Sequence, residues 1–302
     1  MIPTMGNRLT SIPATVCALL ILVALYPQSN AYAAGPASIE RDITYATADG
    51  IDLKLDLCWP SAGPGPFPAL VLIHSGSWGL ETSGTKAECG YMLQEAATRG
   101  YVAAAVEHRL LAFDWSTRTL KHRFPDQVYD VKCAVRWLRA NSKRYNIDSG
   151  QIGAVGWSSG GHLALMLALT DVSDRLEGDC GDGAYSSRIQ AAVSSAGPTE
   201  LASLYSVIPA VIAAFLGGTP DKLPEVYVKA SPLTYVTKDD PPILLINGDM
   251  DTTVPVQQAE ILDAKLTAVG VPHTLVVKKG YGHVALWDEQ EVWEFLDDNL
   301  HP

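Results

Sequence analysis

The sequence predicts a doubly wound α/β fold, in which a mostly parallel sheet of about eight strands carries helices on both faces. Short apolar runs alternate with helical patterns along the chain, which is typical of parallel strands joined by right-handed crossovers. Runs such as Ala69–His74 and Tyr101–Val106 have no polar break, as expected for strands covered on both faces. Hydrophobic residues make up 47% of the 302 residues and charged residues only 18%, which indicates a large buried core.

The first 33 residues have the features of a secretory signal peptide and are not expected to be part of the folded domain. Arg8 supplies a positive charge, and Ile12–Leu25 is an apolar stretch too short to span a bilayer comfortably. Ala31-Tyr32-Ala33 places small residues at the two positions that a signal peptidase reads. We therefore predict cleavage after Ala33 and a secreted or periplasmic protein without a membrane span after cleavage. The alternative is an uncleaved N-terminal anchor.

The formal net charge is −11, which does not favour nucleic acid or an anionic membrane as a partner. Four cysteines follow residue 33, namely Cys58, Cys89, Cys133 and Cys180, and an even number is typical of disulfides in exported chains. Three pairings are possible. We favour Cys89 with Cys180, because both lie in glycine-rich, loop-like sequence, and we expect Cys133 to be a buried filler in a helix. The spacing of cysteine and histidine does not indicate a zinc site.

The predicted elements follow one another in a regular order. Two alternating runs, Asp42–Thr47 and Asp52–Trp59, flank the turn signal Asp49-Gly50 and predict an opening hairpin. Ligands bind at the carboxyl ends of strands in such sheets, so those ends are where a site is expected. The remaining predicted strands are Ala69–His74, Tyr101–Val106, Ile152–Gly156, Ala191–Ser195, Ile243–Asn247 and His273–Lys278, and the predicted helices are Glu88–Arg99, Pro125–Tyr145, Gly160–Leu169, Val256–Val269 and Leu286–Asn299.

Ser158 is the predicted nucleophile. It lies in Gly156-Trp157-Ser158-Ser159-Gly160, between a predicted strand and a predicted helix. A nucleophile elbow needs this setting, because its sharp turn holds the serine at positive φ with the hydroxyl clear of the sheet. Gly156 and Gly160 allow the strand and the helix to pass closely. The pattern alone is common, so the strand–helix setting carries the prediction.

A serine hydroxyl needs a base that removes its proton. In folds with this elbow, the acid and then the histidine follow the serine along the chain. His273, His283 and His301 follow Ser158. His301 is next to the C-terminus, and His273 starts a strand at the wrong end of the sheet. His283 lies in a glycine-containing loop after the last strand, at the right end, and is the predicted base.

The acid is expected after the penultimate strand, where Asp249 and Asp251 compete. We prefer Asp251, because a loop ending in Val254-Pro255 is typical of one that packs behind the carboxylate and turns it toward the histidine. Its expected role is to hold the imidazole tautomer and to stabilise the imidazolium without taking a proton. Asp249 is interpreted as a turn residue that accepts hydrogen bonds from backbone amides.

Backbone N–H groups of Gly76, Ser77 and Ser159 are the predicted donors to the oxyanion of the tetrahedral intermediate. Ser159 directly follows the nucleophile at a helix N-terminus. Gly76 and Ser77 belong to the loop after the strand that ends at His74, and small residues allow that backbone to approach the site. We expect His74 to anchor the loop by hydrogen bonding.

Two further residues lie near the elbow. His162 is expected to be a buried, hydrogen-bonded helix residue and not a base. Trp157 is expected either to line the acyl pocket or to pack under the elbow, and the sequence leaves both open.

The chain resembles the α/β-hydrolase esterases, a group that includes hormone-sensitive-lipase-like and feruloyl- and acetyl-xylan-esterase-like enzymes. The family usually has His-Gly-Gly-Gly where this chain has His74-Ser75-Gly76-Ser77. The resemblance implies an α/β-hydrolase fold and a structural ion pair of Arg109 with Asp126 or Asp130. The motifs that carry it, from about Asp42 to the C-terminus, are His74–Trp78, His108–Leu110, Phe124–Gln127 with Asp130, Gly156–Gly161, Ala230–Pro232, Gly248–Pro255 and Gly282-His283.

Together these features predict a serine hydrolase that cleaves carboxylic esters through an acyl-enzyme intermediate, without a metal or cofactor. Residues 34–302 are expected to form a single domain. Within it, residues 199–230 are expected to form a small flap that limits the substrate to short or medium acyl, acetyl or aromatic esters, free or linked to a polymer. A serine peptidase of the prolyl-oligopeptidase or aminopeptidase type is the alternative, because it shares the elbow. A non-catalytic binding protein is a third reading.

Overall fold

The computed structural model describes residues 37–80, 84–181, 183–287 and 289–301. The predicted signal peptide, residues 1–33, and its cleavage site after Ala33 lie outside these ranges. Within these ranges, none of the helices is both long and apolar enough to cross a membrane.

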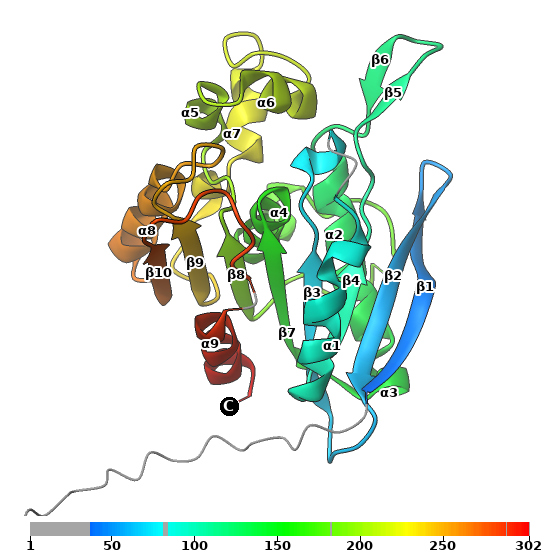
Figure 1. Ribbon diagram of the computed structural model, residues 1–302. Coiled ribbons are helices and arrows are strands. Elements are labelled where there is room, and N and C mark those ends of the chain that lie inside the picture. The colour runs from blue at the N-terminus through cyan, green and yellow to red at the C-terminus, as the bar shows by residue number, and fades with distance from the viewer. Residues whose placement is uncertain (1–36, 81–83, 182, 288, 302) are drawn as a thin grey trace, which may run out of the picture. The chain divides into compact units, whose positions relative to one another are not determined.

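An eight-stranded sheet carries the fold, as Figure 1 shows, in the order β1-β2-β4-β3-β7-β8-β9-β10. β2 pairs antiparallel with β1 and β4, and the other neighbours are parallel. The predicted mostly parallel sheet of about eight strands is therefore confirmed. The strands are β1 Ala37–Ala48, β2 Ile51–Pro60, β3 Phe67–Ile73, β4 Val102–Val106, β7 Ile147–Trp157, β8 Ala191–Ser195, β9 Ile243–Gly248 and β10 His273–Lys278.

Helices cover both faces of the sheet, and successive residues of one strand enter different cores. Val71 and Ile73 of β3 pack into the core shared with α2 and α4, whereas Leu70 and Leu72 pack into the core shared with α1 and α9. This two-sided burial explains why the central strands read as unbroken apolar runs. The helices are α1 Gly90–Thr98, α2 Asp126–Ala140, α3 Ser142–Tyr145, α4 Ser159–Leu169, α8 Gln257–Val269 and α9 Gln290–Leu300.

Three local features differ from the predicted elements. The single helix expected over Pro125–Tyr145 is divided at Asn141, whose side-chain amide and backbone amide both donate to the Trp137 carbonyl. Residues 112–121 form a hairpin, β5 (Ala112–Asp114) and β6 (Thr119–Lys121), that was not expected from the sequence. Residues 199–230 contain three short helices: α5 Leu201–Tyr205, α6 Pro209–Leu216 and α7 Pro224–Ala230.

The disulfide joins Cys133 to Cys180, and Cys58 and Cys89 are free and buried. The predicted pair of Cys89 with Cys180 is therefore wrong, and Cys133 is not a mere filler. The physical reason is that the sheet separates Cys89 from Cys180. Cys89 belongs to the core on the α1 and α9 side, whereas Cys133 and Cys180 belong to the core on the α2 and α4 side.

Candidate active site

Ser158 occupies the turn between β7 and α4, with φ 54° and ψ −120°. Two glycines make this turn possible. A Cβ on Gly156 would lie 2.1 Å from the carbonyl oxygen of Gly160, and a Cβ on Gly160 would lie 2.1 Å from that of Ile73. The Ser158 amide donates to the Ser195 carbonyl at 2.8 Å, which fixes the turn against β8. The backbone thus has the positive φ that an elbow requires.

His283 reaches Ser158 from the loop after β10. Its Nε2 lies 3.0 Å from the Ser158 Oγ, within hydrogen-bonding distance. The loop is held over the site because the Leu286 amide donates to the Ser195 Oγ at 3.1 Å. The His283 side chain is 20% exposed, so the ring is partly shielded but open to solvent.

Asp251 orients the imidazole from the other side. Its Oδ2 lies 2.7 Å from the His283 Nδ1, and its Oδ1 accepts hydrogen bonds from the amides of Thr253 and Val254, both at 2.8 Å. With Nδ1–H donating to the carboxylate, Nε2 is left to accept the proton of the Ser158 hydroxyl. The side chain of Asp251 is fully buried.

Asp249, the competing acid, is used differently. Its Oδ1 accepts from the Gly280 amide at 2.6 Å, and its Oδ2 lies 3.3 Å from the Lys279 ammonium. It accepts from a backbone amide, as expected, but this amide lies 31 residues away, so Asp249 ties the loop after β9 to the loop after β10 and does not close a local turn.

The loop after β3 has an unusual backbone. Gly76, Ser77, Trp78 and Gly79 follow one another at φ 105°, 54°, 57° and 115°. The start of the loop is near the elbow, because a Cβ on Gly160 would also lie 2.6 Å from the carbonyl oxygen of His74. The structure thus brings the loop that contains Gly76 and Ser77 next to the helix that begins at Ser159.

Glu88 supports this loop, and sequence reasoning missed it. Its carboxylate accepts from the Ser75 amide at 2.8 Å and from the Ser75 hydroxyl at 2.9 Å. Ser75 stands where the family usually has glycine, so its hydroxyl gives the loop an extra anchor. The serine at position 75, in place of the usual glycine, was the only hint in the sequence, and nothing in the sequence indicated that Glu88 would be its partner.

Trp78 and His162 fix the loop of Gly76 and Ser77 to α4 and α6. The buried Trp78 ring stacks on Phe215 of α6 with centroids 3.9 Å apart, and its Nε1 donates to the His162 Nδ1 at 3.3 Å. The His162 Nε2–H then donates to the Ala230 carbonyl at 2.8 Å. Burial lowers the pKa of His162 to about 4, so the ring is neutral. These contacts fit the buried structural role expected for His162.

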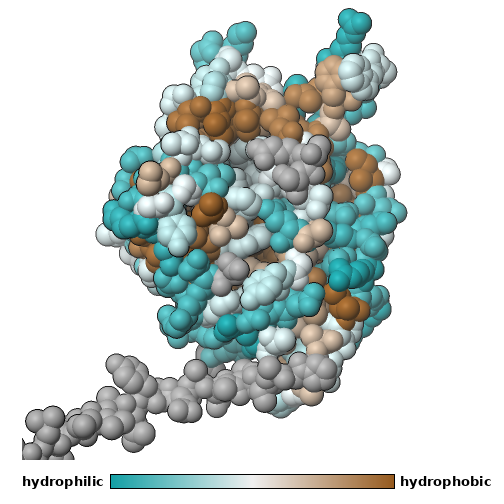
Figure 2. Space-filling model, in the orientation of Figure 1, coloured by the Kyte–Doolittle hydropathy of each residue, from teal (hydrophilic) through white to brown (hydrophobic). Residues whose placement is uncertain are grey.

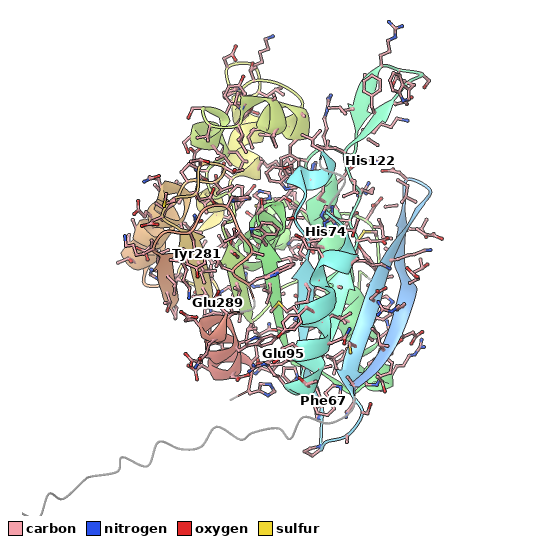
Figure 3. All side chains as sticks on the ribbon, viewed as in Figure 1. Phe67, His74, Glu95, His122, Tyr281 and Glu289 are labelled. Atoms are coloured by element: carbon pink, nitrogen blue, oxygen red, sulfur yellow. A yellow bond between two sulfur atoms is a disulfide. The ribbon has the colours of Figure 1, made fainter. Side chains whose placement is uncertain are left out.

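His74 and His108 stack beneath the same loop, with ring centroids 4.5 Å apart. The His74 Nδ1 lies 2.7 Å from the Ser75 carbonyl oxygen, which is the anchoring bond expected of it. Burial lowers the pKa of both rings below the ordinary value, so both are neutral. Figure 3 shows His74 and Phe67 at opposite ends of β3.

Trp157 packs against the histidine of the site. Its ring centroid lies 5.6 Å from that of His283 and 6.5 Å from that of Trp287. Trp157 therefore lies beside the base of the site, and this position is compatible with both roles left open for it, lining the acyl pocket and packing under the elbow.

Arg109 forms an ion cluster with one buried and two more exposed carboxylates. Its guanidinium lies 2.8 Å from Asp130, 2.6 Å from Asp49 and 3.3 Å from Asp126. Burial opposes the charge, but these carboxylates raise the pKa of Arg109 above its ordinary value. Asp49, His122 and Asp126 have ligand atoms within 4.8 Å of one another. A metal ion does not suit them, because the guanidinium already supplies the cation.

Comparisons with known proteins identify the family. The BD-FAE family model matches residues 55–266. Esterase LipC of Mycobacterium tuberculosis is 31% identical over 213 residues, which cover 68% of this chain and 49% of LipC. Among solved structures, a truncated carbohydrate esterase from gut microbiota is 27% identical, with a TM-score of 0.72 over 86% of this chain and 93% of that chain. The propionate-bound esterase Est2 of Thermogutta terrifontis is 25% identical, with a TM-score of 0.68 over 90% and 93%.

The chain spans about half the length of the curated relatives that it matches first, 49% of LipC and 44% of the probable carboxylic ester hydrolase LipM of the same organism. The two solved structures, in contrast, are covered almost completely. The sheet order, the elbow and these matches agree, and the chain has the α/β-hydrolase fold and belongs to the BD-FAE family.

Proposed function

We propose that this protein is a serine esterase, in which Ser158 is the nucleophile, His283 the base and Asp251 the partner of the base. The observation that carries the proposal is the 3.0 Å contact between the Ser158 Oγ and the His283 Nε2, with Asp251 on the opposite ring nitrogen. A nucleophile, a base and a group that orients the base, in hydrogen-bonding reach of one another, are what covalent catalysis at a serine requires.

The reaction proceeds in two halves. His283 takes the Ser158 proton while Oγ attacks the ester carbonyl, and the resulting oxyanion receives hydrogen bonds from the backbone of Gly76, Ser77 and Ser159. Collapse of this intermediate breaks the bond to the alcohol, which leaves with the proton from the imidazolium. Water, deprotonated by His283, then attacks the acyl-enzyme and releases the acid. The buried Asp251 carboxylate stabilises the imidazolium in both halves.

The flap of residues 199–230 restricts the acyl group to short or medium length. This is supported by the contact of Phe215 in α6 with Trp78, which attaches the flap to the loop that carries the donors. The related esterase Est2 of Thermogutta terrifontis binds propionate, and propionyl is an acyl group of that size. Acetyl and aromatic esters, free or on a polymer, are the substrates that we propose.

Export is part of the proposal. Residues 1–33 act as a signal peptide that is cleaved after Ala33, and residues 34–302 form one secreted or periplasmic domain. The Cys133–Cys180 disulfide supports this, because such bonds persist in oxidising compartments.

The function is tested with two matched substrates. We expect purified protein to hydrolyse p-nitrophenyl acetate and to leave alanine p-nitroanilide intact. Ser158→Ala lowers the rate on the ester by several orders of magnitude. Ser149→Ala, at the exposed amino end of the same strand, is the control and keeps the full rate. Comparable cleavage of the anilide assigns a peptidase instead, and a rate unaffected by Ser158→Ala refutes the mechanism.

A further inference from the structure

The β5–β6 hairpin carries two exposed aromatic rings. It projects beyond the end of the sheet, as Figure 1 shows. Trp115 at its turn is 84% exposed, the largest fraction for any large hydrophobic side chain in the described ranges, and Phe113 is 45% exposed. The two rings meet edge to face with centroids 4.8 Å apart. A paired, exposed tryptophan and phenylalanine is not explained by packing within the chain and points to a ligand.

Both stems of the hairpin are attached to the candidate site. On the first stem, the Leu111 amide donates to the Trp78 carbonyl at 2.9 Å, next to the loop of Gly76 and Ser77. On the second stem, the Phe124 amide donates to the Phe215 carbonyl of α6 at 3.1 Å. The hairpin is therefore hydrogen-bonded both to the loop that contains Gly76 and Ser77 and to α6 of residues 199–230.

One buried side chain ties the two stems together at the base of the hairpin. The fully buried Gln127 donates from its Nε2 to the Arg109 carbonyl at 3.0 Å and also to the carbonyl of His122, so that one side chain bridges the two stems. Figure 3 shows His122 at this base, above His74. These bonds restrict movement of the stems relative to each other, which lowers the entropy lost when a ligand binds on the hairpin.

The surroundings of the aromatic pair are polar. The hydroxyls of Thr117 and Thr119 lie 2.8 Å apart, and the Ser116 hydroxyl donates to Asp114 at 2.6 Å. Arg118 at the turn adds a positive charge. Figure 2 shows a hydrophilic tip on the hairpin above a hydrophobic base. A lipid surface favours apolar tips, whereas a sugar ring combines an apolar C–H face for the aromatic ring with hydroxyls for such polar neighbours.

An apolar surface on the flap accompanies the hairpin. The stretch Val207–Leu216 contains no polar side chain, yet Val207 is 40% exposed and Pro209 and Ala210 are exposed too. Figure 2 shows this hydrophobic surface over α6 and a second one at the base of the hairpin. Contact area for a substrate larger than a simple ester is therefore available on both segments that adjoin Trp78.

We propose that Trp115 and Phe113 form a platform that binds sugar rings of an oligosaccharide or polysaccharide carrying the scissile ester. The proposal rests on the esterase function and specifies its alcohol side. Stacking on the platform holds the polymer while an ester group enters the site at Ser158. Trp115 and Phe113 thus determine specificity for polymer-borne over small esters, and they take no part in the chemistry.

Binding is measured first, without any ester. Native electrophoresis is run through gels that contain de-esterified xylan or glucomannan, with wild type, the Trp115→Ala/Phe113→Ala double variant and Tyr185→Ala. Tyr185 is an exposed aromatic residue on the loop before β8, at the amino end of that strand, and serves as the control. We expect at least one polysaccharide to retard wild type and Tyr185→Ala, and the double variant to run free.

Selectivity is measured second, as the ratio of kcat/KM on acetylated xylan or acetylated glucomannan to kcat/KM on p-nitrophenyl acetate. We expect the double variant to lower the ratio roughly three- to tenfold, which corresponds to about 0.6–1.4 kcal/mol of lost binding to the polymer. Tyr185→Ala leaves the ratio unchanged. Circular dichroism and thermal melts show whether the double variant is folded as wild type.

The outcomes separate the platform from the esterase function. The platform is overturned, and the esterase function is kept, if three results occur together. Wild type hydrolyses p-nitrophenyl acetate, neither polysaccharide retards it, and the double variant has the same ratio of kcat/KM values as wild type. Retardation lost only in the double variant supports the platform even if wild type hydrolyses no ester. Two other results overturn the platform when neither polysaccharide retards wild type. If wild type sediments with phosphatidylglycerol vesicles and the double variant does not, the rings bind a lipid surface. If wild type is a dimer in light scattering and the double variant is a monomer, the rings bind a second copy of the chain.

Discussion

Replacing His162 by glutamine is expected to remove a large part of the loss of stability at acidic pH. His162 is fully buried, accepts a hydrogen bond from Trp78 through Nδ1 and donates one to Ala230 through Nε2. Only the neutral ring can do both. A glutamine also offers one acceptor and one donor, but it does not titrate.

The magnitude follows from the pKa of His162, which burial lowers from 6.5 to about 4. The unfolded chain takes up a proton as the pH falls below 6.5, whereas the native state resists protonation until about pH 4. Stability that His162 contributes at neutral pH is therefore lost progressively as the pH falls through this window. Linkage gives a loss of about 2.5 kcal/mol between about pH 7.5 and about pH 4.5 from this residue alone.

The assay is urea denaturation of wild type and His162→Gln at both pH values. Other groups that titrate, such as His74 and His108, are common to both proteins and cancel in the comparison. We expect the variant to be less stable than wild type at neutral pH, and its deficit to shrink by about 2.5 kcal/mol at the acidic pH. An equal pH dependence in the two proteins refutes the reasoning, because it means that His162 is not held neutral by its surroundings.

Three other perturbations test separate parts of the structure. Asp251→Asn keeps its oxygen on the amides of Thr253 and Val254 and turns an NH2 donor toward the His283 Nδ1, which stabilises the wrong tautomer of the imidazole. We expect kcat on p-nitrophenyl acetate to fall by about three to four orders of magnitude, and a loss below tenfold contradicts the role of the carboxylate. Gly160→Ala forces a Cβ to 2.1 Å from a carbonyl oxygen, and the overpacking is expected to cost roughly 1–3 kcal/mol in chemical denaturation, while Gly90→Ala, with open space around the Cβ, costs nothing. Cys133→Ser with Cys180→Ser opens a loop of 47 residues, so the free energy of unfolding is expected to fall by roughly 4 kcal/mol, and a variant as stable as wild type contradicts this.

Much of the fold could be predicted because it depends on patterns that are local in the chain. Central strands such as β3 and β4 are covered on both faces, so each is a continuous apolar run. The β5–β6 hairpin has strands of only three residues and gives no comparable pattern. The prediction of the disulfide was wrong for another reason, because the local sequence around Cys89 and Cys180 does not indicate on which face of the sheet each residue lies.

The candidate site shows the same division. Ser158 and His283 are 125 residues apart, yet chain order and the rule that sites lie at the carboxyl ends of strands suffice to pair them. Glu88 and Phe215, which hold the loop of Gly76 and Ser77 in place, could not be predicted. Their partners, Ser75 and Trp78, come from other segments, and neither contact follows from a repeating pattern.

The central claim, an activated serine at position 158, is tested most directly by a fluorophosphonate probe followed by peptide mass analysis. We predict one adduct per chain, on the peptide that contains Ser158, and its loss in Ser158→Ala. Labelling should also fall sharply in His283→Ala, because the hydroxyl then has no base. A folded wild type that remains unlabelled, or that carries the adduct on a different residue, contradicts the account.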